Sequence, residues 1–143
     1  MKKAPIRLLV TGSRTWTDEM TIRNTMTDLN QRVSTPLPAF TLVTGACPDG
    51  ADAMALEIAK ELNWDVDSYP ADWDTYGRTA GFRRNIEMVE SHIALCYAFV
   101  MDESSGTTHC LHAARWRKIP TTVWYRYSVE QPLMAPYVSI AKR

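Results

Sequence analysis

Two adjacent arginines, Arg83 and Arg84, open a helical run after a long connection that is rich in Trp, Tyr and Gly. Positive side chains in the first turn of a helix oppose its dipole, at roughly 0.3–1 kcal/mol each, and a bound anion reverses that sign. The pair therefore indicates a phosphate or carboxylate held between the helix amides and one of the arginines. In the alternative, both arginines face solvent or pair with Asp72, Asp74 or Glu87.

Two further segments have the residue types of anion-binding turns. Gly12-Ser13-Arg14 offers a close backbone turn, a hydroxyl and a guanidinium, although a plain tight turn would explain it as well. Ser105-Gly106-Thr107 precedes another helical run, where glycine, hydroxyls and unpaired helix amides make an anion cradle. The alternative for this segment is Thr107 acting as a simple helix cap.

Other candidates are less specific. Gly45 and Gly50 have the outer spacing of a phosphate loop but lack the Lys-Ser/Thr that completes it, and no Gly-x-Gly-x-x-Gly motif is present. Asp52 could hold ribose hydroxyls or simply complement a helix dipole. Trp16 and Trp73 lie between regular elements and could stack on a base or sugar. The predicted ligand-binding residues are Gly12, Ser13, Arg14, Trp16, Gly45, Asp52, Trp73, Arg83, Arg84, Asn85, Ser105, Gly106 and Thr107.

Short apolar runs alternate with amphipathic helical stripes along the chain, and this alternation predicts how the candidates are positioned. The strands are expected over residues 6–11, 40–44, 65–69, 93–100 and 120–125. The order predicts an α/β, Rossmann-like, doubly wound and mainly parallel five-stranded sheet with helices on both faces. Because the unusual polar segments all follow strands, they should converge at the carboxyl edge of the sheet.

Length and charge narrow the class of protein. The 143 residues fit a single domain spanning 1–143, with a core over about 6–125 and an irregular tail at 126–143. Sixteen basic and sixteen acidic residues balance, which disfavours a nucleic-acid partner. Neither a signal sequence nor a membrane-spanning run is evident, and the three cysteines suit a reducing compartment, so a cytoplasmic protein is predicted. His109 and His112 lack convergent ligands, so no metal site is predicted.

Together these segments resemble the SLOG superfamily, a Rossmann-like group that contains the LOG (lysine-decarboxylase-like) phosphoribohydrolases and the DNA-processing protein A fold. The resemblance is strongest to its YspA-like branch of bacteria and phages. It is carried by Val10–Arg14 with Trp16, Val43–Asp52, Tyr69–Trp73, Ala80–Asn85 with Met88, and Ser105–Thr107. It implies a cytosolic domain that binds a nucleotide or nucleotide-derived small molecule as a sensor or sequestering protein. It also implies a homo-oligomer, and no cofactor is predicted.

The same resemblance carries an alternative activity, hydrolysis of the N-glycosidic bond of a nucleoside monophosphate to base and ribose phosphate. In the LOG enzymes a Gly-Gly-x-Gly-Thr-x-x-Glu segment supplies a catalytic glutamate, and a helix arginine assists. Here Gly106-Thr107 matches the Gly-Thr, the glutamate position falls on Cys110, and Arg84 matches the arginine. Asp52, Asp72 or Glu87 could replace the glutamate, and the catalytic candidates are Arg84, Asp52 and Asp72.

Overall fold

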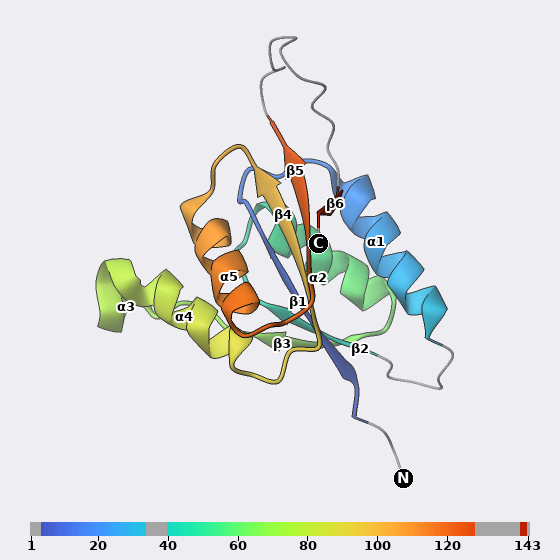
Figure 1. Ribbon diagram of the computed structural model, residues 1–143, viewed down its shortest axis with the longest axis horizontal. Helices are drawn as coiled ribbons and strands as arrows, with labels where there is room; N and C mark the ends of the chain where they lie inside the picture. The colour runs from blue at the N-terminus through green and yellow to red at the C-terminus, as the bar shows by residue number, and fades with distance from the viewer. Residues whose placement is uncertain (1–3, 34–39, 128–140, 143) are drawn as a thin grey trace.

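The computed structural model describes residues 4–33, 40–127 and 141–142 (Figure 1). In this part of the chain one sheet has the strand order β3-β2-β1-β4-β5-β6. The parallel strands are β1 (Ile6–Gly12), β2 (Phe40–Thr44), β3 (Asp65–Ser68), β4 (Leu95–Met101) and β5 (Thr121–Arg126). This arrangement confirms the predicted Rossmann-like α/β fold, because the strand order reverses between β1 and β4.

The central strand β1 is apolar on both sides because helices cover both faces of the sheet. Leu8 and Val10 belong to the larger core cluster, whereas Leu9 belongs to a separate one on the opposite face. This division follows from the alternation of side chains along a strand. The register places Leu8 beside Leu42 of β2 and Leu95 of β4.

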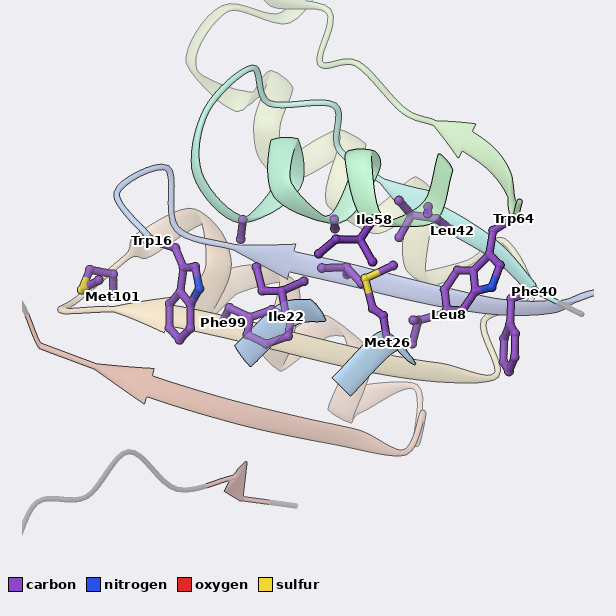
Figure 2. Packing of buried hydrophobic residues seen from close by; sticks show 14 residues of the cluster. Leu8, Trp16, Ile22, Met26, Phe40, Leu42, Ile58, Trp64, Phe99 and Met101 are labelled. Atoms are coloured by element: carbon purple, nitrogen blue, oxygen red, sulfur yellow. The ribbon is translucent and has the colours of Figure 1, made fainter. Parts of the chain in front are cut away.

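Four helices form the two outer layers. α1 (Glu19–Arg32) and α2 (Gly50–Glu61) supply buried residues to the larger cluster, in which Ile22 lies near Phe99 and Ile58 near Leu42 (Figure 2). α4 (Ala80–Val89) and α5 (Ser105–Trp116) cover the other face, where buried side chains of both helices join the second cluster. No helix within the described ranges is long and apolar enough to span a membrane.

The connection after β3 is largely helical, so the prediction of a long loop was wrong. α3 (Trp73–Tyr76) and the 3-10 turn η1 (Gly77–Thr79) lead directly into α4. Asp72 caps α3, its carboxylate accepting a hydrogen bond from the Thr75 amide at 3.1 Å. Because residues 72–79 are all exposed, these short helices leave no apolar stripe in the sequence.

The tail contributes one further element. β6 (Ala141–Lys142) pairs antiparallel with β5, opposite Val123 and Trp124. The sequence did not predict this strand, since two residues are too few to display a period. The rest of the predicted tail beyond residue 127, apart from β6, lies outside the described residues.

Candidate functional site

A pocket of about 580 Å³ lies at the carboxyl ends of β1, β2 and β4 and extends to α4. Its volume is typical of small-molecule sites. Four segments that are distant in sequence meet there, as the placement of the polar residues after strands predicted. The lining includes the candidates Gly12, Ser13, Arg14, Gly45, Asp52, Trp73, Arg84, Asn85, Ser105, Gly106 and Thr107, but not Trp16, Arg83 or Asp72.

Arg84 is the most tightly oriented cation of the pocket. Its Nη1 donates to the carbonyl oxygens of Gly45 at 2.6 Å and Tyr69 at 3.3 Å, and its Nε donates to Asn85 Oδ1 at 2.9 Å. No acceptor bonds Nη2 among the described residues. Gly45 has to be glycine for this approach, because a Cβ there would lie 2.6 Å from Nη1. The guanidinium is therefore held in place with one nitrogen left for a ligand.

Arg83 is directed away from the pocket. Its guanidinium lies 4.4 Å from the centroid of the Tyr76 ring, and its Nε donates to Thr79 Oγ1 at 3.2 Å. Adjacent helical residues point about 100° apart, so only one of the two arginines can face the ligand space. Arg83 and Arg84 are the fourth and fifth residues of α4, which begins at Ala80, so Arg84 lies beyond the first turn in which it was expected.

Asn85 is buried and makes its hydrogen bonds within the protein. Besides accepting from Arg84, its amide nitrogen donates to the Gly106 carbonyl at 3.1 Å and lies 3.3 Å from His109 Nδ1. The side chain thus joins α4 to the start of α5. It lines the pocket, but its amide is committed to positioning its neighbours.

Ser13 has a similar structural role at the end of β1. Its hydroxyl accepts from the Met101 amide at 2.9 Å, and its own amide donates to the Phe99 carbonyl at 2.9 Å. Gly12 is required by the adjacent packing, because a Cβ there would lie 2.3 Å from the Ala51 Cβ. Arg14 follows as an exposed side chain at the pocket wall. Of this predicted anion turn, Arg14 is the group that remains available to a ligand.

Asp52 is a buried carboxylate at the start of α2, only 6% exposed. Its Oδ2 accepts from the Cys47 amide at 3.2 Å. Burial raises the pKa of Asp52, while the hydrogen bonds from Cys47 and the charges of Arg84 and Arg14 act in the opposite direction. Burial and the nearby carboxylate also raise the pKa of the Cys47 thiol. The pocket floor thus holds a carboxyl group suited to carrying a proton.

The start of α5 forms another wall. Ser104 is the N-cap, and its hydroxyl donates to Thr107 Oγ1 at 3.0 Å while accepting from the Thr107 amide at 3.5 Å. Thr107 is therefore the partner of the cap and not the cap itself. Ser105 and Gly106 are exposed in the first turn, and no atom lies within 4 Å of a Cβ built on Gly106. Such a helix start favours a negative group.

Two aromatic side chains line the pocket on the α3–α4 side. Trp73 is 50% exposed and its indole lies 3.3 Å from the position of a Cβ on Gly81. Phe82 is 45% exposed, with its ring 4.4 Å from that of His109. Exposed rings beside a cationic pocket are suited to stacking on a planar ligand.

Trp16 does not stack on a ligand, and this prediction was wrong. The side chain is 1% exposed and packs edge-on against Phe99 at 5.3 Å in the core (Figure 2). Its indole N–H donates to the Asp18 carbonyl at 2.8 Å, and the guanidinium of Arg126 lies 5.4 Å from its ring. The segment after β1 folds back over the sheet, so its aromatic residue fills the core.

Several pocket residues were not predicted from the sequence. They are Thr11, Thr15, Cys47, Arg78, Gly81, Phe82, Met88, Met101, Asp102, Glu103 and Ser104. Five of them, Thr15, Cys47, Asp102, Glu103 and Ser104, come shortly after β1, β2 or β4, and for these five that position was the available signal. Cys110, which occupies the glutamate position of the LOG segment, is fully buried and does not line the pocket. No cluster of three potential metal ligands occurs in the described part of the chain.

The sequence of this chain is similar to those of known proteins. The model of the YspA, cpYpsA-related SLOG family matches residues 6–76. The Gene 61 protein of Mycobacterium phage D29 is 37% identical over 117 residues, which cover 80% of this chain and 92% of that protein. The chain belongs to the YspA, cpYpsA-related SLOG family. No solved structure gives a significant match.

Within this SLOG-family chain, the matched region ends at Tyr76 and includes β1, β2, β3, α1, α2 and α3. It therefore supplies Arg14, Gly45, Asp52 and Trp73 to the pocket, while Arg84 and the α5 start come from the following part of the chain. The phage relative aligns with most of the chain.

Proposed function

We propose that this SLOG-family protein binds a nucleotide or nucleotide-derived small molecule at the pocket, as a cytosolic sensor or sequestering domain. One observation carries the proposal: three arginine side chains, the free start of α5 and two exposed aromatic rings line the same cavity. Cations and helix amides favour an anion, whereas the rings favour a planar group. A nucleotide contains both parts.

In this proposal Arg84 and Arg14 bind phosphate together with the amides of Ser105 and Gly106. The fixed orientation of Arg84 supports this role, since its position is set before a ligand arrives. Trp73 or Phe82 would stack on the base. Asp52 would accept a hydrogen bond from a ribose hydroxyl, or donate one in its protonated form.

Hydrolysis of an N-glycosidic bond is a second candidate because Asp52 places a carboxyl group in the pocket. Burial raises the pKa of this group, which suits a residue that exchanges a proton near neutral pH. Water would add to the anomeric carbon as the base leaves with a proton, with Arg84 holding the phosphate. Asp72 no longer fits this role, because it caps α3 and does not line the pocket.

The test is a series of incubations with AMP, GMP, NAD, ADP-ribose and cyclic ADP-ribose, read by thermal shift and then by chromatography of the same sample. Stabilisation with intact ligand would establish binding, and release of free base would establish hydrolysis. Wild-type protein that no compound in the series stabilises and that releases no base would contradict both.

Arg84→Ala and Arg83→Ala form a matched pair for this series. Both remove one cation from the same helix, but only Arg84 lines the pocket. Loss of a hydrogen-bonded charge costs about 1.5–3 kcal/mol, so Arg84→Ala should weaken binding by at least tenfold. Arg83→Ala should bind as the wild type does. Equal losses in the two variants would show a general charge effect and remove the central contact of the proposal.

A further inference from the structure

The orientation of the Asn85 amide is determined by neighbours of known polarity. Arg84 Nε always carries a hydrogen, so the Asn85 atom 2.9 Å away has to be the oxygen. The Gly106 carbonyl only accepts, so the atom 3.1 Å from it has to be the amide nitrogen. The two independent partners agree on one orientation of the side chain.

This orientation determines the state of His109. The Asn85 amide nitrogen also lies 3.3 Å from His109 Nδ1, and an amide nitrogen can only donate. Nδ1 therefore has to be an acceptor, which requires a neutral ring with its hydrogen on Nε2. A continuous chain of hydrogen bonds then leads from His109 through Asn85 to Arg84 and the Gly45 carbonyl.

Protonation of His109 would break this chain. A hydrogen on Nδ1 would face the hydrogens of the Asn85 amide. If the amide turned over to accept it, the amide nitrogen would face Arg84 Nε and the oxygen would face the Gly106 carbonyl. The first contact would place two hydrogen-bond donors together and the second two acceptors, and Arg84 would lose its side-chain acceptor.

The surroundings of His109 favour the neutral ring. The Phe82 ring of α4 lies against it, tilted by 33°, and the groove beside it is lined mainly by apolar residues of α4 and α5. The ionisable groups of this groove are His112 and Arg117, and Arg117 is paired with Glu90. Burial, and secondarily His112, lower the pKa of His109.

We propose that Asn85 and His109 are positioning residues for Arg84, and that Arg84 keeps its hydrogen bond to Asn85 only while His109 is neutral. The link to ligand binding rests on the proposed function, whereas the link between His109 and Arg84 does not. Acidification would then release Arg84 from its Asn85 contact while leaving the two backbone carbonyls as its acceptors.

The experiment is a pH titration of the ¹⁵N-labelled full chain without ligand, between about pH 5 and pH 8 and lower if His109 requires it. The ring nitrogens of His109 report its tautomer and titration, and the Arg84 Nε–H resonance reports the hydrogen bond to Asn85. We expect the Nε2–H tautomer and a shared midpoint for the two residues. An Nδ1–H tautomer, or an Arg84 resonance that does not follow His109, would overturn the proposal.

Three variants distinguish positioning from a general structural effect. His109→Asn places a non-titrating oxygen near the Nδ1 position and should leave the Arg84 resonance independent of pH. Asn85→Ala should uncouple Arg84 from His109, which still titrates. His112→Asn is the matched control on the same helix and should preserve the coupling. If the Arg84 resonance still changes with pH in His109→Asn, the titrating group is a different one and the proposal fails.

ADP-ribose provides the ligand measurement, because its pyrophosphate, unlike a phosphate monoester, has no ionisation near pH 6. We expect its affinity for the wild type to fall roughly tenfold on protonation of His109, as for loss of one charged hydrogen bond, and to be independent of this step in His109→Asn. Failure to bind ADP-ribose at any pH would exclude this compound as the ligand of the proposed function. The ligand-free titration would still decide the positioning role.

Discussion

Gly45→Ala tests directly whether the pocket depends on the position of Arg84. The added Cβ would lie 2.6 Å from Nη1 and 2.8 Å from Cζ of Arg84, and 3.2 Å from Asp52 Oδ2. An ordinary contact begins at 3.4 Å, so Nη1 has to withdraw by about 0.8 Å. The flexible end of a side chain can make this movement, so the fold should survive.

The cost can be estimated from the contacts that the movement disrupts. Nη1 bonds the Gly45 carbonyl at 2.6 Å, and a withdrawal of that size takes this bond beyond the usual range. A hydrogen bond to a charged group contributes about 1.5–3 kcal/mol. If ligand phosphate depends on the same guanidinium position, affinity should fall by about 10- to 100-fold.

A double-mutant cycle measured by calorimetry with the nucleotide that binds the wild type gives the assay. Gly45→Ala should weaken binding when Arg84 is present and have almost no effect in the Arg84→Ala background, since the guanidinium that the new Cβ displaces is then absent. Circular dichroism of each variant verifies the fold. Additive losses, or full affinity in Gly45→Ala, would refute the assignment of Arg84 as the oriented anion contact.

Three further perturbations address other parts of the structure. Burial raises the pKa of Asp52 above its unfolded value of 3.8, so the protonated carboxyl contributes stability at low pH, and this contribution is lost as pH rises through the folded pKa. Asp52→Asn carries no charge at this position and should therefore raise the melting temperature near pH 8. A difference in melting temperature between Asp52→Asn and the wild type that stays constant with pH would contradict this prediction. Trp16→Ala should cost about 3–5 kcal/mol in chemical denaturation, whereas Trp73→Ala should leave stability within about 0.5 kcal/mol and weaken nucleotide binding roughly tenfold. The reverse pattern would exchange their roles. Trp116 is 84% exposed beside an apolar groove, and we propose that this face carries a homo-oligomer contact: Trp116→Glu should then lower the mass measured by light scattering, and an unchanged mass would exclude this face.

The sheet was predictable because each parallel strand carries a short apolar run that helices cover on both sides. β1, β2 and β4 are buried along most of their length, and their order follows from regular βαβ connections. α3 was not predictable in this way. Its four exposed residues are stabilised by the Asp72 cap and have no buried face to impose a period.

The site was predictable in location but not in the direction of its side chains. Arg83 and Arg84 are equivalent in sequence, and only the start of α4 at Ala80 decides which of them faces the pocket. Trp16 follows a strand as the true pocket residues do, yet its segment folds back onto Phe99. Asn85 was expected to bind ligand, and its commitment to Arg84, Gly106 and His109 depends on contacts between α4 and α5 that no local pattern records.

The two outer strands of the described sheet bear on how readily two molecules can pair through their sheet edges. An open strand edge is a template for pairing with another molecule, and β3 is such an edge in the described sheet. β3 is short and carries Asp65, whose charge opposes the approach of a second β3, whereas Asp67 is paired with Arg7. On the opposite side β6 pairs with β5 at Val123 and Trp124. The described sheet thus ends in a strand that carries an acidic charge on one side and in a strand of only two residues on the other, and both features disfavour edge-to-edge pairing.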